Sequence, residues 1–355
     1  MKRNSFSGLL IENIQELYSN FITEAQLDSG LGKDVYLSYV NENSDEFNEV
    51  FEKYIIEESN RKFTIQYDKF FNLCLDNQRT NSALNNSSLS HFFSYINTCH
   101  VVLKNVEKVI TGNKVSTSDV VLLTLYGFML RQADQIGHML LSGYNDGALV
   151  LWRSFYEYAL TLKLLCDKDE EDLTMRFYHH RIRNLKKQME SYQERLEPLG
   201  FRVLEDEKKN DIDDFFDTIA SQHGKKFLDN EYGWADHLFP GKKRATARDL
   251  EDLVDFGRYR AFYIKASGYA HTGFANIQEY QRDDNFALDI ITFQTTDIRK
   301  LIDPMQLTIA VFHDVNISFL ELLSDEVELD INIKVLKKIS DNLMDSFDLK
   351  STSNS

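Results

Sequence analysis

The sequence predicts an all-α protein, built as a bundle of long helices. Its 355 residues include only 3 prolines and 15 glycines, and such scarce chain-breaking residues favour long helices over a strand-rich fold with many turns. Hydrophobic residues make up 43% of the chain, so a sizeable core is available. Apolar side chains also recur with helical spacing along most of the chain.

The N-terminal region, residues 1–115, is expected to be helical and carries no recognisable chemistry. Apolar spacing predicts three helices there, at residues 6–28, 43–77 and 89–110. A polar turn around Gly30 and Gly32 ends the first helix, and a polar loop over residues 77–88 precedes the third.

A helical hairpin is predicted next. Ser116 and Asp119 resemble a capping box that opens a helix from about residue 118 to residue 142. A tight turn over residues 143–147 leads into a second helix, from about residue 146 to residue 166, that is apolar on nearly all sides. A helix of that kind belongs at the centre of a bundle. Two long helices joined by a short turn form an antiparallel pair.

Two further helices and a long loop follow. An acidic stretch over residues 167–172 suits the first turn of a helix that runs to about residue 196. Residues 206–222 are predicted to be helical, and residues 223–245, with Trp234, are predicted to form a loop. Loops of this length without secondary structure are uncommon in compact domains and often carry function.

The C-terminal part is also predicted to be helical. Thr246 and Asp249 are expected to cap a helix that continues to His271, just before Gly273. Residues 281–296 are irregular or weakly extended. A helix from Thr296 to Leu323, interrupted at Pro304, and a last amphipathic helix over residues 330–347 follow. The expected regions are a helical N-terminal region, a helical bundle domain, and a C-terminal helix with a disordered tail, at residues 1–115, 116–323 and 324–355.

Composition excludes several classes of protein. The net charge of −16 argues against a general nucleic-acid or membrane-surface binder, although a local basic groove is compatible with it. The cysteines, Cys74, Cys99 and Cys166, form no Cys-x-x-Cys pair, as expected of reduced thiols in a cytoplasmic protein. The start is no signal peptide, and the longest apolar run, residues 120–130, is too short to span a bilayer. The HExxH, Walker, GxSxG and GxGxxG motifs are absent, so we expect no cofactor.

Two polar groups lie on otherwise apolar segments. Tyr259, Tyr263, Ser267 and His271 recur every four residues, and a step of four residues on a helix drifts by about 40°, so they form one winding stripe. Arg153 and Glu157, also four residues apart, share one face of the most apolar helix. Their aromatic neighbours predict burial, and buried charges need partners. We predict that the fold brings the two groups together.

Each group has a catalytic and a structural interpretation. In the catalytic one, Arg153 holds a phosphate or carboxylate while Glu157 orients a reacting group. His271 is the general acid or base, because histidine titrates near neutral pH. Metal-independent RNA cleavage needs a base for the 2′-hydroxyl and a cation for the phosphorane, and His271 with Arg153 or Arg260 would supply both. In the structural one, the same side chains form a buried network that holds helices in register.

The order of these segments resembles a known family. ALVLWRSFYEYAL is followed by RFYHH, a Trp-containing loop and YRAFYIKASGYAH. Over residues 120–280 this order is similar to the prokaryotic domain-of-unknown-function family numbered fifty-six seventy-seven. That family combines an Arg-Ser-x-x-Glu helix with a later Tyr-x-x-x-Ser-x-x-x-His helix. The resemblance implies an all-α bundle with distant kinship to HEPN domains, and hence a homodimer with its site near the interface.

Many HEPN proteins are RNA-cutting toxins or phage-defence effectors, some with a partner protein from the same system. Their nucleases carry an arginine and a histidine with four to six residues between them. Arg131 and His138 fit with six residues between them and share a helical face, although a chance pair would look the same. In RFYHH, the spacing from Arg176 to His179 and His180 is too short. Adjacent histidines point to different helix faces, so no metal is expected.

Clusters of basic residues are the remaining candidates for RNA contact. The first cluster comprises Arg176, Arg181, Arg183, Lys186 and Lys187. Two shorter clusters follow, at residues 225–226 and 242–248. Charge runs are usually solvated helix faces, but in an acidic chain they also suit a phosphate-bearing ligand. The leading hypothesis is a HEPN-like endoribonuclease or toxin-type effector of antiviral defence, and the alternative is a non-catalytic helical interaction module.

Overall fold

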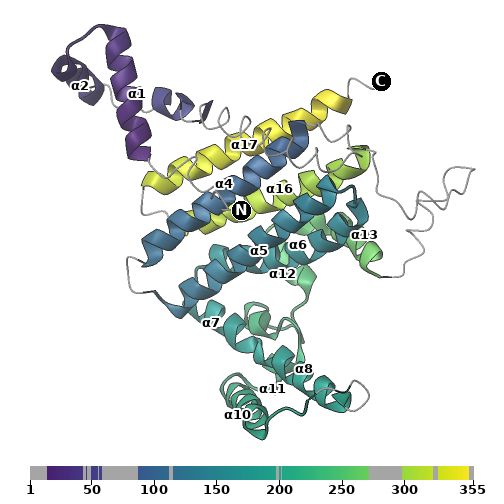
Figure 1. The fold of residues 1–355 in the computed structure, drawn as a ribbon. Coiled ribbons are helices and arrows are strands. Elements are labelled where there is room, and N and C mark those ends of the chain that lie inside the picture. Colours follow the sequence, from purple (N-terminus) through teal and green to yellow (C-terminus); the bar gives the residue numbers. More distant parts are fainter. Residues whose placement is uncertain are drawn as a thin grey trace, which may run out of the picture. The chain divides into compact units, whose positions relative to one another are not determined.

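The computed structural model confirms the all-α prediction. It describes residues 14–42, 49–54, 56–57, 87–111, 115–196, 202–271, 298–322 and 327–351, together with residues 45 and 200. Within these ranges most residues lie in helices and none lies in a strand (Figure 1). None of the helices in the described part of the chain is both long and apolar enough to cross a membrane.

The chain divides into two compact units. Unit 1 comprises Met1–Asn113, Tyr126–Ala159 and Ala261–Ser355, and unit 2 comprises Lys114–Leu125 and Leu160–Arg260. This division groups the chain differently from the three regions expected along the sequence. The reason is that α17 packs against both α4 and α16, so helices from the two ends of the chain belong to unit 1.

The helices of unit 1 include α1 (Ile14–Ser29), α2 (Lys33–Glu42), α4 (Ser87–Thr111), α16 (Ile298–Glu321) and α17 (Val327–Ser351), together with α13 (Arg260–Ala270) from Ala261 onward. The predicted helix over residues 89–110 is confirmed as α4. The turn at Gly30 is also confirmed, and Gly30 has a φ of 69°, a conformation that favours glycine. Helix α2 was not predicted. Most of residues 43–88, and all of residues 281–296, lie outside the described residues.

The predicted interruption at Pro304 is wrong, because α16 continues through it. A proline inside a helix costs about 3 kcal/mol. Burial of one large apolar side chain contributes about 1.5–3 kcal/mol, and α16 buries Leu301, Met305, Ile309 and Phe312 completely. The apolar face of α16 therefore outweighs its proline.

A buried polar network joins α4, α16 and α5 (Thr117–Leu141) inside unit 1. Asn316 is 1% exposed. Its amide donates to the Tyr95 hydroxyl at 3.0 Å and to the Cys99 sulfur at 3.3 Å, and its carbonyl accepts from the Tyr126 hydroxyl at 2.6 Å. Burial raises the pKa of Cys99 to about 12, so this thiol stays neutral and unreactive.

The hairpin prediction is confirmed by α5 and α6 (Asn145–Lys168), each of which contributes to both units. The Ser116 hydroxyl accepts from the Asp119 backbone N–H at 3.0 Å, and the Asp119 carboxylate accepts from the Ser116 backbone N–H at 2.8 Å. This reciprocal pair is the capping box that the sequence predicted.

The helices that lie wholly within unit 2 include α7 (Glu171–His180), α8 (Ile182–Glu194), α10 (Asp206–His223), α11 (Lys225–Asp229), η3 (Gly233–Leu238) and α12 (Ala247–Leu253). Helix α10 confirms the prediction for residues 206–222. The single helix expected up to residue 196 is wrong, because the chain turns at Arg181. The structureless loop expected over residues 223–245 is also wrong, because it contains α11 and η3, held by the buried Trp234.

The helix expected from Asp249 to His271 is broken. The capping box of Thr246 and Asp249 is confirmed, but the helix that it opens, α12, ends at Leu253. Asp255 then adopts a left-handed φ of 56°, and the backbone N–H of the fully buried Phe256 bonds back to Glu251. A 3₁₀ turn, η4 (Gly257–Tyr259), precedes α13. Burial of Phe256 thus interrupts the helical register, and Tyr259 is not part of the polar stripe on α13.

Candidate functional site

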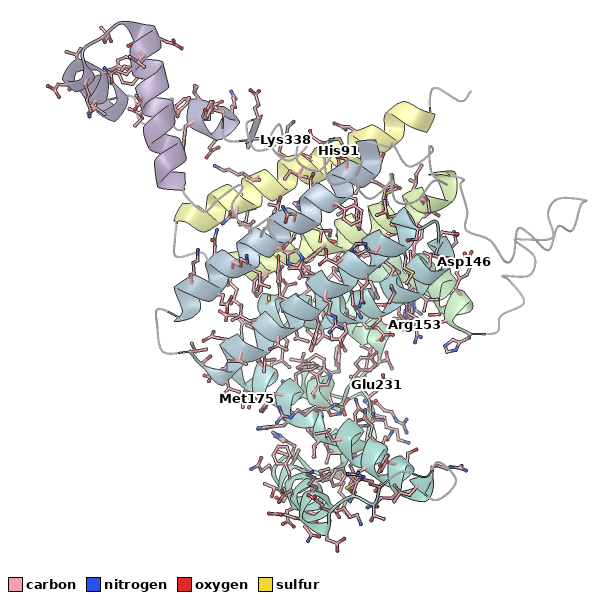
Figure 2. All side chains as sticks on the ribbon, in the orientation of Figure 1. His91, Asp146, Arg153, Met175, Glu231 and Lys338 are labelled. Carbon is pink, nitrogen blue, oxygen red and sulfur yellow. The ribbon has the colours of Figure 1, made fainter. Side chains whose placement is uncertain are left out.

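Three predicted site residues meet on α6 and α13, within unit 1. Arg153, which is labelled in Figure 2, lies on α6 one turn before Glu157, with 3.3 Å between Nη2 of the arginine and Oε1 of the glutamate. The Tyr263 hydroxyl donates to the same Oε1 at 2.7 Å and accepts from Nε of Arg153 at 3.4 Å. The guanidinium also lies over the Tyr263 ring, 5.5 Å from its centroid. These contacts confirm that the two helices meet at their polar groups.

The expected burial of this cluster is wrong. The Arg153 side chain is 31% exposed and the Glu157 side chain is 44% exposed. Val150, on the same side of α6, is also 37% exposed. Helix α6 is therefore not buried on all sides, and one stripe along it remains open to solvent. A sealed structural network is excluded by this exposure.

Tyr263 holds its proton firmly. Partial burial raises the pKa of its phenol, the hydrogen bond to Glu157 raises it further, and Arg153 opposes the shift. The phenol is therefore neutral and donates to the carboxylate. A guanidinium, a carboxylate and a phenol that solvent can reach form a polar site suited to binding an anionic group through the arginine.

Ser267 and His271 do not join this cluster. The Ser267 hydroxyl donates to the Tyr263 carbonyl at 2.8 Å, within α13. His271 is exposed and directly follows α13, with its backbone N–H bonded to the Ser267 carbonyl. Its imidazole forms no hydrogen bond or ion pair with any other residue that the structure describes. His271 lies eight residues beyond Tyr263, which corresponds to about 12 Å along a helix axis.

The weaker candidates lie apart from the cluster. Arg131 and His138 are both exposed on α5. Tyr259 is buried in unit 2. Arg260 forms an ion pair at 3.0 Å with Glu251, a residue of unit 2 that is 1% exposed. The Arg260 guanidinium is therefore engaged in an ion pair with a buried carboxylate of unit 2.

The basic residues predicted to contact RNA lie on α7, α8 and the turn between them. They do not form one basic surface. The Arg181 guanidinium lies 3.7 Å from the Tyr178 ring centroid, Lys186 pairs with Asp213, and Arg183 donates to Asn184. Lys187 is exposed. Arg176 instead turns toward α10 and η3.

Arg176 leads to a polar cluster that the sequence did not predict. Its Nη1 lies 3.2 Å from Nδ1 of His223, and Nε2 of His223 lies 3.4 Å from Nδ1 of His179. His223 is distant from both in the sequence, so spacing rules applied to RFYHH alone could not find it. One signal was available: four of the chain's nine histidines fall within residues 179–237. Among the described residues, no group of three or more His, Cys, Asp or Glu is arranged to hold a metal ion.

We expect unit 2 to lose stability as the pH falls from about 7 toward 5, because its histidines are held neutral. His180 is 7% exposed and bonds to the Asn230 carbonyl at 2.8 Å, and burial lowers its pKa. A lowered folded-state pKa means that the unfolded chain binds protons first. The stability contribution is therefore complete above about pH 6.5 and is lost as the pH falls through the folded-state pKa.

Urea unfolding followed by Trp234 fluorescence at several pH values checks this expectation. The variant His180→Gln should flatten the pH dependence, whereas His138→Gln, at an exposed position in unit 1, should leave it unchanged. An unaltered slope in His180→Gln would contradict the assignment.

Comparison with known proteins identifies one family. Residues 119–288 match the model of a family of unknown function (DUF5677). No curated protein and no solved structure matches the chain. The matched range contains both the Arg153 cluster and the Arg176 cluster, and it agrees with the resemblance that the sequence motifs predicted. The segment from residue 119 to residue 288 is therefore similar to this family of unknown function.

Proposed function

We propose that the protein is a HEPN-like endoribonuclease that cleaves RNA in the cytoplasm without a metal ion, as a toxin-type effector of antiviral defence that acts as a homodimer. One observation carries the proposal. Arg153, Glu157 and Tyr263 come from helices far apart in the sequence, yet meet at a partly exposed position. The proposed activity is also that of many HEPN proteins, to which the sequence motifs bear a distant resemblance.

Each residue has a definite part in the proposed reaction. Arg153 binds the scissile phosphate and stabilises the charge that develops on the phosphorane. Glu157 and Tyr263 hold the guanidinium from two sides, so that it is oriented before RNA binds. His271 exchanges the proton with the 2′-hydroxyl or the leaving group, because an imidazole can serve as general acid or base.

The position of His271 sets a condition on how RNA binds. About 12 Å of helix separates it from Tyr263. The 2′-hydroxyl and the leaving oxygen lie next to the scissile phosphate, so the C-terminal end of α13 must move toward Arg153 when RNA binds, to bring His271 within reach of them.

An RNA cleavage assay in the presence of a metal chelator tests the proposal. The full-length chain should cleave a labelled single-stranded RNA. Arg153→Gln is expected to slow cleavage about 10²–10³-fold, as when one donor to a developing oxyanion is lost. His271→Ala is expected to slow it about 10²–10⁴-fold, as when a general acid or base is removed. Lys265→Gln removes a charge from α13 away from the cluster and should retain full activity.

Two outcomes would reject the proposal. One is the absence of cleavage by the unmodified chain. The other is cleavage that persists in both Arg153→Gln and His271→Ala, which would reveal a contaminating nuclease. The alternative function, a non-catalytic interaction module, predicts no cleavage, but a loss of stability when Glu157 is replaced by glutamine, because that cluster would then serve only to join α6 and α13.

A further inference from the structure

Arg176 is a partly buried cation in unit 2, and its contacts are with neutral groups. Its Nε donates to the Trp234 carbonyl at 3.0 Å, its Nη1 donates to His223, and its guanidinium lies 5.1 Å from the Phe227 ring centroid. No carboxylate lies within ion-pair distance among the residues that the structure describes. Asp172 and Asp236 favour its charge from beyond ion-pair distance against the cost of burial, and an incoming anion would add direct contacts with the guanidinium.

Arg176 also dictates where the protons of the two histidines lie. A guanidinium can only donate, so Nδ1 of His223 accepts and the neutral ring carries its proton on Nε2. That N–H faces Nδ1 of His179 at 3.4 Å, which leaves the His179 proton on Nε2. The His223 ring stacks on the buried Phe227 with 4.5 Å between centroids, and this contact holds the chain of donors in place.

The surrounding charges keep both histidines neutral. For His179, burial lowers the pKa, Arg181 lowers it further and Asp172 opposes. For His223, burial lowers the pKa, followed by Arg176 and His179, again against Asp172.

The third element at the site, η3, contributes Asp236 and His237. The Asp236 carboxylate already accepts from the Ala245 backbone N–H at 2.6 Å and from the Asn230 amide at 3.1 Å. Burial and Arg176 lower the pKa of His237, while Asp172 and Glu170 raise it. The net result is a guanidinium beside imidazoles that are held neutral while no anion is bound.

We propose that Arg176, His223 and His179 form a binding site for a phosphate group. The guanidinium supplies the permanent charge. On protonation each imidazole exchanges its hydrogen bond within the chain for one to the bound anion, and the anion offsets the added positive charge. Binding is therefore coupled to proton uptake, so affinity rises as the pH falls. A metal ion is a poorer fit, because the adjacent guanidinium repels a cation and the described residues offer no set of three metal ligands there. The site is separate from the Arg153 cluster and does not depend on the proposed cleavage activity.

Nuclear magnetic resonance of the histidine ring nitrogens in the full-length chain tests this proposal. Sulfate is the main probe, because it remains a dianion over the range in which histidine titrates, and inorganic phosphate is the second. Both should raise the pKa of His179 and of His223, and sulfate should bind more tightly at about pH 5.5 than at about pH 7.5. Arg176→Gln is expected to weaken sulfate binding about tenfold or more, since charge-assisted hydrogen bonds are lost.

Matched variants separate a specific site from general charge effects. Lys187→Gln removes one positive charge from the same basic segment at an exposed position, and it should leave sulfate binding unchanged. His179→Gln, at the solvent-facing end of the hydrogen-bonded chain, should weaken binding and lessen its pH dependence, and it provides a test if Arg176→Gln does not fold. The proposal fails if sulfate and phosphate leave the histidines unaffected, if Lys187→Gln weakens binding as much as Arg176→Gln, or if the rings respond to Zn²⁺ alone.

Discussion

Replacing Arg260 by alanine is expected to destabilise unit 2 by about 2 kcal/mol, because it removes the ion-pair partner of a buried carboxylate. Glu251 is 1% exposed and bonds to Nη1 of Arg260 at 3.0 Å. Breaking a fully buried pair by removing one partner costs about 3–5 kcal/mol. The expected value is smaller here because the Arg260 side chain is 39% exposed and water screens its charge.

Two tryptophans make the measurement specific for one unit. Trp234 is buried in unit 2 and Trp152 is buried in unit 1, so a Trp152→Phe background leaves Trp234 as the reporter of urea unfolding. The control is Arg258→Ala. Arg258 pairs with Asp255, which is 88% exposed, and loss of an exposed pair should cost less than about 1 kcal/mol. Equal effects of the two substitutions would show that Glu251 does not need its partner.

Replacing Asn316 by alanine is expected to destabilise unit 1 by about 3 kcal/mol, because it removes a hydrogen-bond partner from two buried tyrosine hydroxyls and leaves a small cavity. Tyr95 and Tyr126 are both 0% exposed, and neither hydroxyl can turn to water in the folded state. The Cys99 sulfur loses a weaker contact.

A double-mutant cycle separates the hydrogen bonds from the packing. In a Trp234→Phe background, Trp152 reports the unfolding of unit 1. Asn316→Ala should cost less when Tyr126 is already phenylalanine, because the hydroxyl that it would leave without its partner is gone. Additive effects of the two substitutions would contradict the network and attribute the cost to packing alone.

Local features of the fold could be predicted from the sequence because they depend on neighbouring residues. The capping boxes at Ser116 and Thr246 use residues three positions apart, and both form as expected. Helices α4, α5, α6 and α10 follow from apolar spacing. The meeting of Arg153 with Tyr263 was also predictable, since a polar side chain on an apolar helix needs a partner.

The helix boundaries that failed were decided by burial. The sequence near Asp255 contains no proline, so nothing local predicts a break there. The helix ends because Phe256 is packed in the interior of unit 2, which requires the left-handed turn at Asp255. At Pro304 the opposite holds. The proline by itself would end the helix, but packing of the apolar face of α16 keeps the helix intact.

The sequence by itself determined the all-α class, the similarity of residues 119–288 to one family and the identity of the polar residues on α6 and α13. Only the tertiary structure decided how exposed Arg153 and Glu157 are, that His271 stands apart from them, and that Arg176 meets His223. The physical reason is that the interactions concerned act over different distances along the chain. Capping and amphipathic periodicity act within one or two helical turns, whereas solvent exposure and the partners of a charged side chain depend on whichever distant helix covers it.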